Sequence, residues 1–435
     1  MRVSVLGAGY LGATHAAALA AIGHDVVVVD VDADRVARLS TGRAPFYEPR
    51  LDELLTHGIA AGRLAFVTRA ERAAEHAKVH FLCVGTPQAD GTGAADLRDV
   101  WAAVESICPG LRPGALLVGK STVPVGTALR LQARMRELSA TDVEVAWNPE
   151  FLREGHAIED SLHPDRLVLG VATSRAEQIL RQLYAPLIYA GVDVIRTDRN
   201  TAELAKVSAN AMLAARLSVV NVFAEVCEAA NASVLDLVSI LGSDPRIGSS
   251  YLTPGLGFGG GCLPKDIRGF VARAEELGAG RAVQLLREVD ATNTRQRART
   301  AELATSWLAA VRGRRVAILG AAFKGGSDDV RDSPALAVAE ELSRGGAEVR
   351  VYDPMALAAA RRACPQLDYR TDVTSACADV DLILVLTDWD EFESLDPVAL
   401  REVVAHPQIV DTRQLLDATK WGAAGWRIHV LGNGR

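Results

Sequence analysis

The sequence predicts an α/β protein with two doubly wound parallel sheets joined by a long central helix. Short apolar strands alternate with helical segments at both ends of the chain, the first strand–turn pattern recurs near residue 315, and residues 201–228 contain neither Pro nor Gly. A chain of 435 residues also exceeds one ordinary core, since domains have roughly 100–200 residues. We expect an N-terminal domain over 1–198, a central helical region over 199–298 and a C-terminal domain over 299–435.

The first strand, residues 3–6, runs directly into a glycine-rich turn and an Ala-rich helix. The next strand, residues 26–29, ends at Asp30. Strand, G-x-G-x-x-G, helix, strand and acid together form the fingerprint of a Rossmann-like dinucleotide site, in which the pyrophosphate approaches the helix N-terminus. A carboxylate at Asp30 accepts bonds from ribose and repels a 2′-phosphate, so we expect NAD rather than NADP. The turn residues expected at the cofactor are Gly7, Gly9, Tyr10, Leu11 and Gly12.

Polar residues follow three further strands of this domain. Thr86 follows the expected strand at residues 80–84, and Thr122 follows the one at 115–118. Glu150 and Glu154 follow the expected strand at 143–147. Ligands bind at the carboxyl ends of strands in open α/β sheets. Glu150 and Glu154 would share one face if a helix starts there. They are candidates for a general base or a substrate contact, or they are acids that favour a helix N-terminus.

The long central helix carries Lys206 and Asn210 one turn apart. Residues at this spacing share a helix face, so both side chains can point into one cleft. A solvated Lys beside an incidental Asn is the alternative. The opposite, apolar face is larger than one helix needs, which favours a homodimer built through this helix; it comprises Leu213, Leu217, Val220 and Val226.

The stretch Gly257-Phe-Gly-Gly-Gly-Cys262-Leu-Pro-Lys-Asp266 sets one cysteine behind a run of glycines. Glycines allow the backbone to approach a ligand closely. A thiol in such a loop near a cation can ionise and act as a nucleophile. A small buried structural cysteine is the alternative at this position.

Near Arg315 the chain repeats its beginning. The stretch from Arg315 to Gly320 resembles residues 2–7, and the strand that ends at Asp353 resembles the one that ends at Asp30. The three-glycine fingerprint is missing from the second copy, so we expect it to bind a different ligand. Its strand-end cations are either phosphate contacts or ordinary surface charges: Lys324, Arg331 and Arg413.

Composition excludes several classes of protein. The net charge is −7 with acids and bases interspersed, so a nucleic-acid partner is not expected. The six cysteines have no paired spacing and no metal-ligand pattern is present, so we expect no metal site and reduced thiols. No uninterrupted apolar run of about 18 residues and no leader segment is expected, which favours a cytoplasmic protein that does not bind membranes.

These segments together resemble the UDP-glucose/GDP-mannose dehydrogenase family along essentially the whole chain, most closely its UDP-glucose 6-dehydrogenase branch. The resemblance implies an NAD-dependent four-electron oxidation of the C6 alcohol of UDP-glucose to UDP-glucuronate, through a thiohemiacetal and a thioester on Cys262. It implies that Lys206 and Asn210 stabilise negative charge on oxygen. Asp266 and Thr122 position or activate water, and Glu150 acts as base or water holder. The motifs that carry the resemblance include residues 7–12, 85–87, 120–124, 148–155, 257–266 and 322–331.

The resemblance also implies binding roles. Further NAD contacts are expected from Arg35, Thr86, Thr122, Glu154 and Arg331. The second Rossmann-like domain is expected to bind the nucleotide diphosphate. The residues expected around the sugar nucleotide are Glu150, Phe151, Leu152, Lys206, Asn210, Arg246, Tyr251, Gly259, Phe323, Lys324 and Arg413.

Several alternatives stay open. Leu263 stands where the UDP-glucose branch usually has Phe, and Asp411-Thr-Arg413 departs from the commoner Asp-Gly-Arg, so GDP-mannose, dTDP-glucose and UDP-N-acetylmannosamine remain candidate substrates. A two-electron hydroxyacid dehydrogenase would also use a Lys and an Asn on a long helix, with a structural cysteine. A non-catalytic NAD-binding protein is a third alternative, which the complete set of polar residues argues against.

Overall fold

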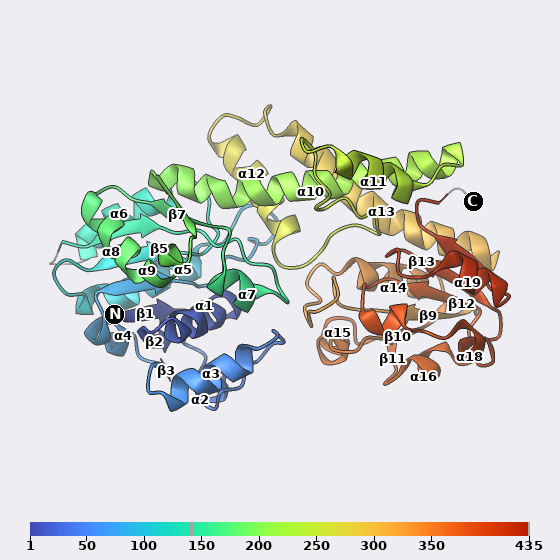
Figure 1. Cartoon of the computed structure of the whole chain (residues 1–435), viewed down its shortest axis with the longest axis horizontal. Coiled ribbons are helices and arrows are strands. Elements are labelled where there is room, and N and C mark those ends of the chain that lie inside the picture. Colours follow the sequence, from blue (N-terminus) through green and yellow to red (C-terminus); the bar gives the residue numbers. More distant parts are fainter. Residues whose placement is uncertain (139–141, 434–435) are drawn as a thin grey trace. The chain divides into compact units, whose positions relative to one another are not determined.

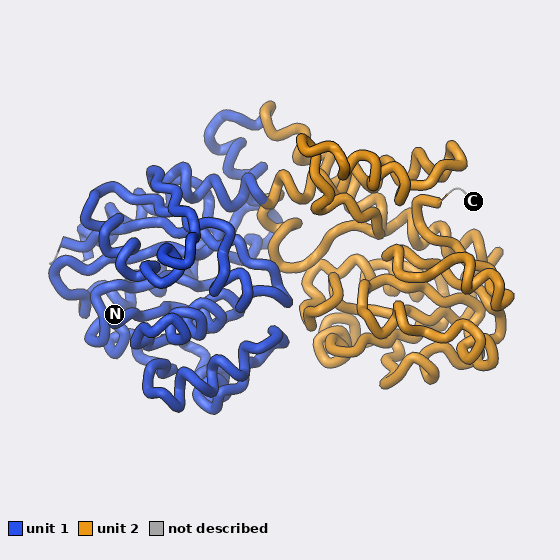
Figure 2. Tube along the Cα trace, in the orientation of Figure 1, with its two compact units in different colours: residues 1–209, 269–280 blue, residues 210–268, 281–435 orange. Residues whose placement is uncertain are grey.

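A computed structural model describes residues 1–138 and 142–433; the remaining five positions lie inside the ranges expected for the N- and C-terminal domains, outside the described residues. The chain divides into two compact units (Figure 2). Unit 1 comprises residues 1–209 and 269–280, and unit 2 comprises residues 210–268 and 281–435. Each unit contains one parallel-sheet domain, which confirms the predicted α/β class with two Rossmann-like domains.

Unit 1 contains an eight-stranded sheet in the order β3-β2-β1-β4-β5-β6-β7-β8. The strands from β3 to β6 in this order are parallel, whereas β7 pairs antiparallel with β6 through Trp147 and Gly170. The strands are β1 (Arg2–Leu6), β2 (Asp25–Val29), β3 (Leu64–Val67), β4 (Val79–Leu82), β5 (Leu116–Gly119), β6 (Glu144–Trp147), β7 (Arg166–Gly170) and β8 (Asp193–Thr197).

Helices cover both faces of this sheet, because alternate residues of the buried strands point to opposite sides. Val3 and Val5 belong to one apolar core, whereas Leu6 and Leu82 belong to the core on the other face. Figure 1 shows the helices around the blue-to-green strands. They are α1 (Tyr10–Ala21), α2 (Ala33–Ser40), α3 (Leu51–Ala60), α4 (Ala70–His76), α5 (Arg98–Ile107), η1 (Cys108–Gly110), α6 (Thr127–Leu138), α7 (Ala157–Leu162), α8 (Ser174–Leu183) and α9 (Ala185–Tyr189).

The sheet of unit 2 has six parallel strands in the order β11-β10-β9-β12-β13-β14. Leu382 and Leu384 pack into one core and Ile383 and Val385 into the other. The strands are β9 (Arg315–Leu319), β10 (Glu348–Tyr352), β11 (Asp368–Tyr369), β12 (Leu382–Val385), β13 (Gln408–Asp411) and β14 (Arg427–Val430). The helices are α14 (Pro334–Arg344), α15 (Leu357–Ala363), α16 (Val373–Cys377), α17 (Asp390–Glu393), α18 (Pro397–Arg401) and α19 (Ala418–Ala423).

The second sheet repeats the start of the first. β9 lies between β10 and β12 as β1 lies between β2 and β4. Gly320 ends β9 with φ +107°, and Gly7 ends β1 with φ +95°. The similarity of the two sequence segments therefore reflects the same strand–turn arrangement in both domains.

Four helices connect the two sheets along the chain: α10 (Arg199–Ala230), α11 (Val234–Ser243), α12 (Leu263–Glu276) and α13 (Gln284–Leu308). α10 has 32 residues, two more at each end than the uninterrupted segment in the sequence. It meets the length and hydropathy criteria of a membrane span, which the sequence analysis did not expect, but 44% of the apolar window is buried in the protein. A long apolar helix in the core of a protein meets the same two criteria, so they are weak evidence for a membrane span.

The exposed apolar face of α10 differs from the expected one. Val220 is fully buried and Leu217 packs against an interior cluster, so these residues cover the protein's own core. Val226, which also belongs to the expected face, has 59% of its surface exposed. The exposed stripe consists instead of Met212, Val219, Val222 and Val226.

Candidate active site

The turn between β1 and α1 has the shape that a dinucleotide needs. A Cβ on Gly12 would overlap the carbonyl oxygen of Gly7, so only Gly permits this close turn. A Cβ on Gly9 would meet nothing within 4 Å, and this open side is where a pyrophosphate can approach the backbone. Tyr10 and Leu11 start α1 directly behind it. The turn therefore fits the diphosphate of NAD.

Asp30 follows β2 beside this turn and is buried. Its Oδ2 accepts a bond from the Ala8 amide at 2.7 Å, and Oδ1 accepts one from the Asp32 amide at 2.9 Å. The Arg35 guanidinium lies 3.1 Å from both oxygens. Arg35, expected near the adenosine end, thus holds the carboxylate expected to read the ribose.

Two threonines meet at the carboxyl ends of β4 and β5. The Thr86 hydroxyl donates to the Thr122 carbonyl at 2.7 Å. Ser121, between them in the fold, donates to the Val84 carbonyl at 2.7 Å. The two loops are therefore tied together at the sheet edge where the cofactor turn also lies.

Glu150 and Lys206 form a buried ion pair. The Lys206 Nζ lies 2.9 Å from Glu150 Oε1, and both side chains are about nine-tenths buried (7% and 11% exposed). The other Glu150 oxygen accepts a bond from the Leu152 amide at 2.6 Å. Phe151 lies beneath the Arg166 guanidinium, 4.1 Å from its ring centroid. Lys206 is thus no solvated lysine, and its charge is held beside the proposed base.

No helix starts at Glu150, because residues 148–153 are extended and α7 begins only at Ala157. Glu150 and Glu154 therefore do not share a helix face. The sequence analysis also missed Glu48, a buried carboxylate that accepts bonds from the Gly155 and Ala157 amides at 2.7 Å each and from the Tyr10 hydroxyl. Burial and this carboxylate raise the pKa of Tyr10. Nothing in the local sequence of Glu48 indicated this role.

Lys120 is a second residue that sequence reasoning left without a role. It is 7% exposed, and its Nζ donates to Asn148 Oδ1 at 3.0 Å. The Tyr184 hydroxyl donates to the same oxygen at 2.6 Å. Burial lowers the pKa of Lys120 to about 8, against the opposing influence of Cys83 and Glu150. A lysine that follows an apolar strand and precedes Ser-Thr was the only signal in the sequence.

In unit 2, Cys262 stands at the start of α12 and is exposed. Its carbonyl accepts the Asp266 amide at 2.9 Å, so the thiol lies at the helix N-terminus, where a thiolate is favoured. Asp266 is buried, accepts a bond from Asn210 Nδ2 at 2.7 Å and pairs with Lys265 at 2.6 Å. Lys265 therefore holds Asp266.

Lys206 and Asn210 both belong to α10, and each contacts a different carboxylate. Lys206 pairs with Glu150 inside unit 1, whereas Asn210, one turn further, bonds Asp266 inside unit 2. Both residues are 5% exposed. The two residues found from their helical spacing thus each have an acidic partner, Glu150 for Lys206 and Asp266 for Asn210.

Of the residues expected around the sugar nucleotide, four lie around Phe323 in unit 2: Gly259, Phe323, Lys324 and Arg413. Arg413 donates to the carbonyls of Leu386 (2.8 Å) and Phe323 (3.2 Å), and burial lowers its pKa. Lys324 Nζ lies 5.7 Å from the Phe323 ring centroid. Gly259 is buried and packs against Phe323 and Asp332, which follow β9 in the chain. Arg331 forms an ion pair with Asp329.

Arg246 and Tyr251, also expected at the sugar nucleotide, precede the glycine loop in the chain. Arg246 pairs with Asp244, and its side chain is 87% exposed. Tyr251 is 36% exposed and has φ +58°. Within the described ranges, no three His, Cys, Asp or Glu side chains gather to hold a metal ion.

Family models match three consecutive parts of the chain. The UDP-glucose/GDP-mannose dehydrogenase NAD binding domain matches residues 1–188, the central domain 200–295 and the UDP binding domain 317–418. The chain belongs to the UDP-glucose/GDP-mannose dehydrogenase family. NAD is its cofactor, as the cofactor turn indicates, and the family assignment made from the sequence is confirmed.

Full-length relatives agree with this assignment. The chain is 39% identical to the UDP-glucose 6-dehydrogenase of Rhizobium meliloti, over 99% of both chains. A UDP-glucose dehydrogenase structure from Pyrobaculum islandicum has 36% identity and a TM-score of 0.90, over 99% of this chain and 96% of that one. A UDP-D-ManNAc dehydrogenase structure from Pyrococcus horikoshii has 28% identity and a TM-score of 0.87, over the full length of both.

The two domains of this family member use equivalent acids differently. Asp353 ends β10 as Asp30 ends β2, but Asp353 is fully buried. Its oxygens accept bonds from four backbone amides and from the Trp389 indole. Asp353 thus ties the turn after β9 to the residues that follow β10 and to Trp389.

Proposed function

We propose that this protein oxidises the C6 alcohol of UDP-glucose to the carboxylate of UDP-glucuronate with NAD. The observation that carries the proposal is the exposed Cys262 at the N-terminus of α12, in the same helical turn as Asp266, which pairs with the buried Asn210. The name and full-length match of the relatives support the substrate.

Electron counting shows why a nucleophile is needed. Oxidising a primary alcohol to a carboxylate removes four electrons, so two NAD are consumed for each sugar. When bound, NAD supplies the hydride acceptor for each two-electron oxidation. The intermediate aldehyde is reactive, and a covalent bond to the protein prevents its escape.

Cys262 is proposed to form that bond. Its thiolate adds to the aldehyde carbon, and the carbonyl π electrons move to oxygen, giving a thiohemiacetal. Loss of a hydride from that carbon converts the thiohemiacetal to a thioester. Water then adds to the thioester carbon, the C–S bond breaks, and the thiolate and the carboxylic acid are released.

The remaining polar residues have roles that follow from their charges. The Lys206 ammonium and the Asn210 amide stabilise negative charge on the reacting oxygen. Glu150, which Lys206 holds in place, acts as the base or holds the water. Asp266 and Thr122 position the water that hydrolyses the thioester.

Binding roles are proposed for the other residues. Gly7, Gly9, Tyr10, Leu11 and Gly12 hold the NAD diphosphate, and Asp30 with Arg35 holds its adenosine ribose. Further NAD contacts come from Thr86, Glu154 and Arg331. The sugar nucleotide is bound by Phe151, Leu152, Arg246, Tyr251, Gly259, Phe323, Lys324 and Arg413.

UDP-N-acetylmannosamine is the second candidate substrate. The match of residues 317–418 to a UDP binding domain favours a uridine nucleotide for both candidates. The solved UDP-D-ManNAc dehydrogenase has the lower identity, which favours UDP-glucose.

The enzyme is further proposed to act as a cytoplasmic homodimer. Its six cysteines are all free, which supports a reducing compartment. The stripe of Met212, Val219, Val222 and Val226 on α10 is an exposed apolar face that a second copy would cover.

Counting NADH for each sugar nucleotide tests the proposal. A screen of UDP-glucose, UDP-N-acetylmannosamine, GDP-mannose and dTDP-glucose should give two NADH for each UDP-glucose consumed. One NADH would identify a two-electron alcohol dehydrogenase instead. Cys262→Ser should stop release of UDP-glucuronate while NAD binding is retained, and unchanged acid production would contradict the role of the thiol.

A further inference from the structure

The loop that precedes Cys262 cannot hold its own shape. Four of the five residues from Gly257 to Gly261 are glycines, and Gly257 and Gly260 have φ of +103° and +83°. Glycines lose the most conformational freedom on folding, so their order requires bonds from neighbouring elements. The position of the thiol therefore depends on the groups that bind this loop from outside.

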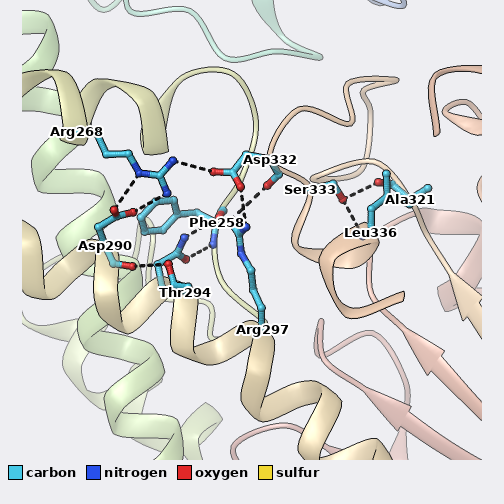
Figure 3. A network of polar contacts seen from close by, with 10 residues as sticks. Phe258, Arg268, Asp290, Thr294, Arg297, Ala321, Asp332, Ser333 and Leu336 are labelled. Atoms are coloured by element: carbon cyan, nitrogen blue, oxygen red, sulfur yellow. Dashed lines mark hydrogen bonds and ion pairs between the residues drawn. The ribbon is translucent and has the colours of Figure 1, made fainter. Parts of the chain in front are cut away.

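Helix α13 provides the first set of bonds (Figure 3). The buried Asn293 amide accepts a bond from the Phe258 amide at 2.7 Å and donates to the Phe258 carbonyl at 2.9 Å. Arg297, one turn further, donates to the same carbonyl at 3.0 Å. Both backbone groups of Phe258 are thus fixed by side chains of one helix.

The loop between β9 and α14 provides the second set. The Gly260 amide donates to the Arg331 carbonyl at 2.9 Å. A Cβ on Gly259 would overlap the Asp332 carbonyl, and one on Gly261 would overlap the Arg331 side chain. These glycines allow the backbone of the cysteine loop to pack directly against residues 331–332.

Asp332 joins the two sets of bonds. Its Oδ1 accepts a bond from Arg297 at 2.7 Å, and its Oδ2 lies 3.7 Å from the Arg268 guanidinium. Arg268 belongs to α12, the helix that starts directly after Cys262, and is held by Asp290 at 2.9 and 3.1 Å. One carboxylate therefore contacts the arginine that holds the loop and an arginine of the helix that carries the thiol (Figure 3).

The carboxylate of Asp332 is not needed to start α14. Ser333 caps that helix by accepting the Leu336 amide at 3.3 Å, and its hydroxyl donates to the Ala321 carbonyl at 2.7 Å. Asp332 also has φ +45°, an unfavourable conformation for a residue with a side chain. Helix capping therefore does not account for the positive φ of Asp332 or for its contacts with Arg297 and Arg268.

We propose that Asp332 is a positioning residue for the Cys262 thiol, acting through Arg297 and Arg268. It does not touch the substrate in this proposal. By fixing the glycine loop and the first turns of α12 together, it sets where the thiolate stands when the aldehyde forms. The inference rests on the proposed function, because it assumes that Cys262 captures an aldehyde.

Asp332→Asn tests this role with little change of shape. Asn tolerates positive φ as well as Asp does, so the backbone is retained while the charge between the two arginines is lost. Asp379→Asn is the matched control: Asp379 also has positive φ (+56°) and pairs with an arginine, Arg315, at 3.7 Å, but its side chain is 77% exposed. Both variants should show similar thermal unfolding.

Two readouts separate positioning from stability. The first is the rate of Cys262 alkylation by iodoacetamide against pH, followed by mass spectrometry on the free protein. A looser loop aligns the thiolate less well with the α12 N-terminus, so the pH midpoint should move upward in Asp332→Asn and stay unchanged in Asp379→Asn.

The second readout is the fate of the aldehyde. With UDP-glucose, NAD and semicarbazide as trap, Asp332→Asn should release a trapped aldehyde and give fewer than two NADH per sugar. Its kcat should fall about tenfold, since the reacting group is displaced. Asp379→Asn should keep two NADH per sugar.

A wild-type alkylation midpoint in Asp332→Asn would overturn the proposal, and so would a full two NADH with no trapped aldehyde. If Asp332→Asn does not fold, Arg297→Lys replaces it, because a single ammonium lacks the planar fork whose two nitrogens donate separately to Asp332 and to Phe258; it should show the same two changes. If the wild type does not oxidise UDP-glucose, the proposed function fails, and the alkylation midpoint alone decides the role of Asp332.

Discussion

At the scale of single residues, Gly9 and Gly12 separate the fold of the cofactor turn from its binding. A methyl group at Gly12 would overlap backbone, so Gly12→Ala should lower the free energy of unfolding by about 1–3 kcal/mol. A methyl group at Gly9 meets no protein atom, so Gly9→Ala should stay within about 0.5 kcal/mol of the wild type. Gly9→Ala should nevertheless weaken NAD binding, because the methyl group occupies the side where the diphosphate approaches. Urea unfolding and NADH fluorescence titration measure the two effects, and normal NADH binding by Gly9→Ala would contradict this placement.

Lys120 should make stability depend on pH above neutrality. Its pKa is lowered by burial to about 8 in the folded protein, whereas an unfolded lysine titrates near 10.4. Between these pH values the unfolded chain binds more protons, so stability rises with pH. The difference in unfolding free energy between wild type and Lys120→Met should therefore shift in favour of the wild type by up to about 3 kcal/mol from pH 7 to 10.5. Urea titrations at several pH values measure it.

The exposed Lys420 provides the control for that measurement. Lys420→Met should give a difference from the wild type that does not change over the same pH range. A flat difference for Lys120→Met as well would show that the buried amine keeps an ordinary affinity for its proton.

Lys206 and Asn210 were selected from their helical spacing, and the cofactor glycines from a complete motif. Their catalytic and binding roles stay predictions. Glu48 and Asp332 were missed, because each acts on backbone or on arginines far away in the chain. Such partners are fixed by the tertiary fold, and no local pattern indicates them.

At the scale of elements, α10 is held to α6 by one buried carboxylate. Glu203 of α10 accepts the Gly126 and Ala128 amides at 2.7 and 2.6 Å, at the N-terminus of α6. Amides in the first turn of a helix have no partner within the helix, so a side chain from α10 satisfies them. This contact fixes the segment of α10 that carries Lys206.

Glu203→Gln should destabilise the protein by about 1–2 kcal/mol, because only one oxygen is left for two amides. Burial raises the pKa of Glu203 to about 7. The folded protein then binds more protons than the unfolded chain between pH 4.5 and 7, so this contribution to stability falls as the pH rises. The advantage of wild type over Glu203→Gln should accordingly be larger at pH 5 than at pH 7 in thermal unfolding scans, and the opposite trend would contradict the raised pKa.

Element prediction from the sequence succeeded where the strands are mostly buried and apolar, as in β1, β2, β4 and β5. β3 and β8 were missed; the residues of β3 alternate between buried and more exposed positions, and those of β8 are half exposed and show no apolar run. Glu150 was assigned conditionally to a helix that the structure does not contain. Two acids at i, i+4 are compatible with an extended loop, and the bonds from Leu152 and Lys206 to Glu150 decide the outcome.

At the scale of the whole molecule, the two sheets illustrate how one strand arrangement receives two ligand specificities. In the first domain, Asp30 is held partly by Arg35. In the second domain, the equivalent Asp353 accepts bonds from four backbone amides and from the Trp389 indole. The recurrence of the first strand and turn near Arg315 was found in the sequence. The difference in ligand followed from the missing glycines, but the different bonding of Asp353 required the structure.

The exposed stripe of α10 predicts how copies of the molecule associate. Met212, Val219 and Val226 are seven residues apart, so they form one line along the helix, and each is about half exposed or more. A stable dimer buries about 800 Å² on each partner with an apolar centre. Val219→Asp with Val226→Asp would place two charges in that centre, so the double variant should sediment as a monomer at concentrations where the wild type is a dimer. Tyr189→Asp, at an isolated aromatic residue that is 90% exposed, should leave sedimentation unchanged. A wild-type monomer, or a double variant that still sediments as a dimer, would rule out association through this face.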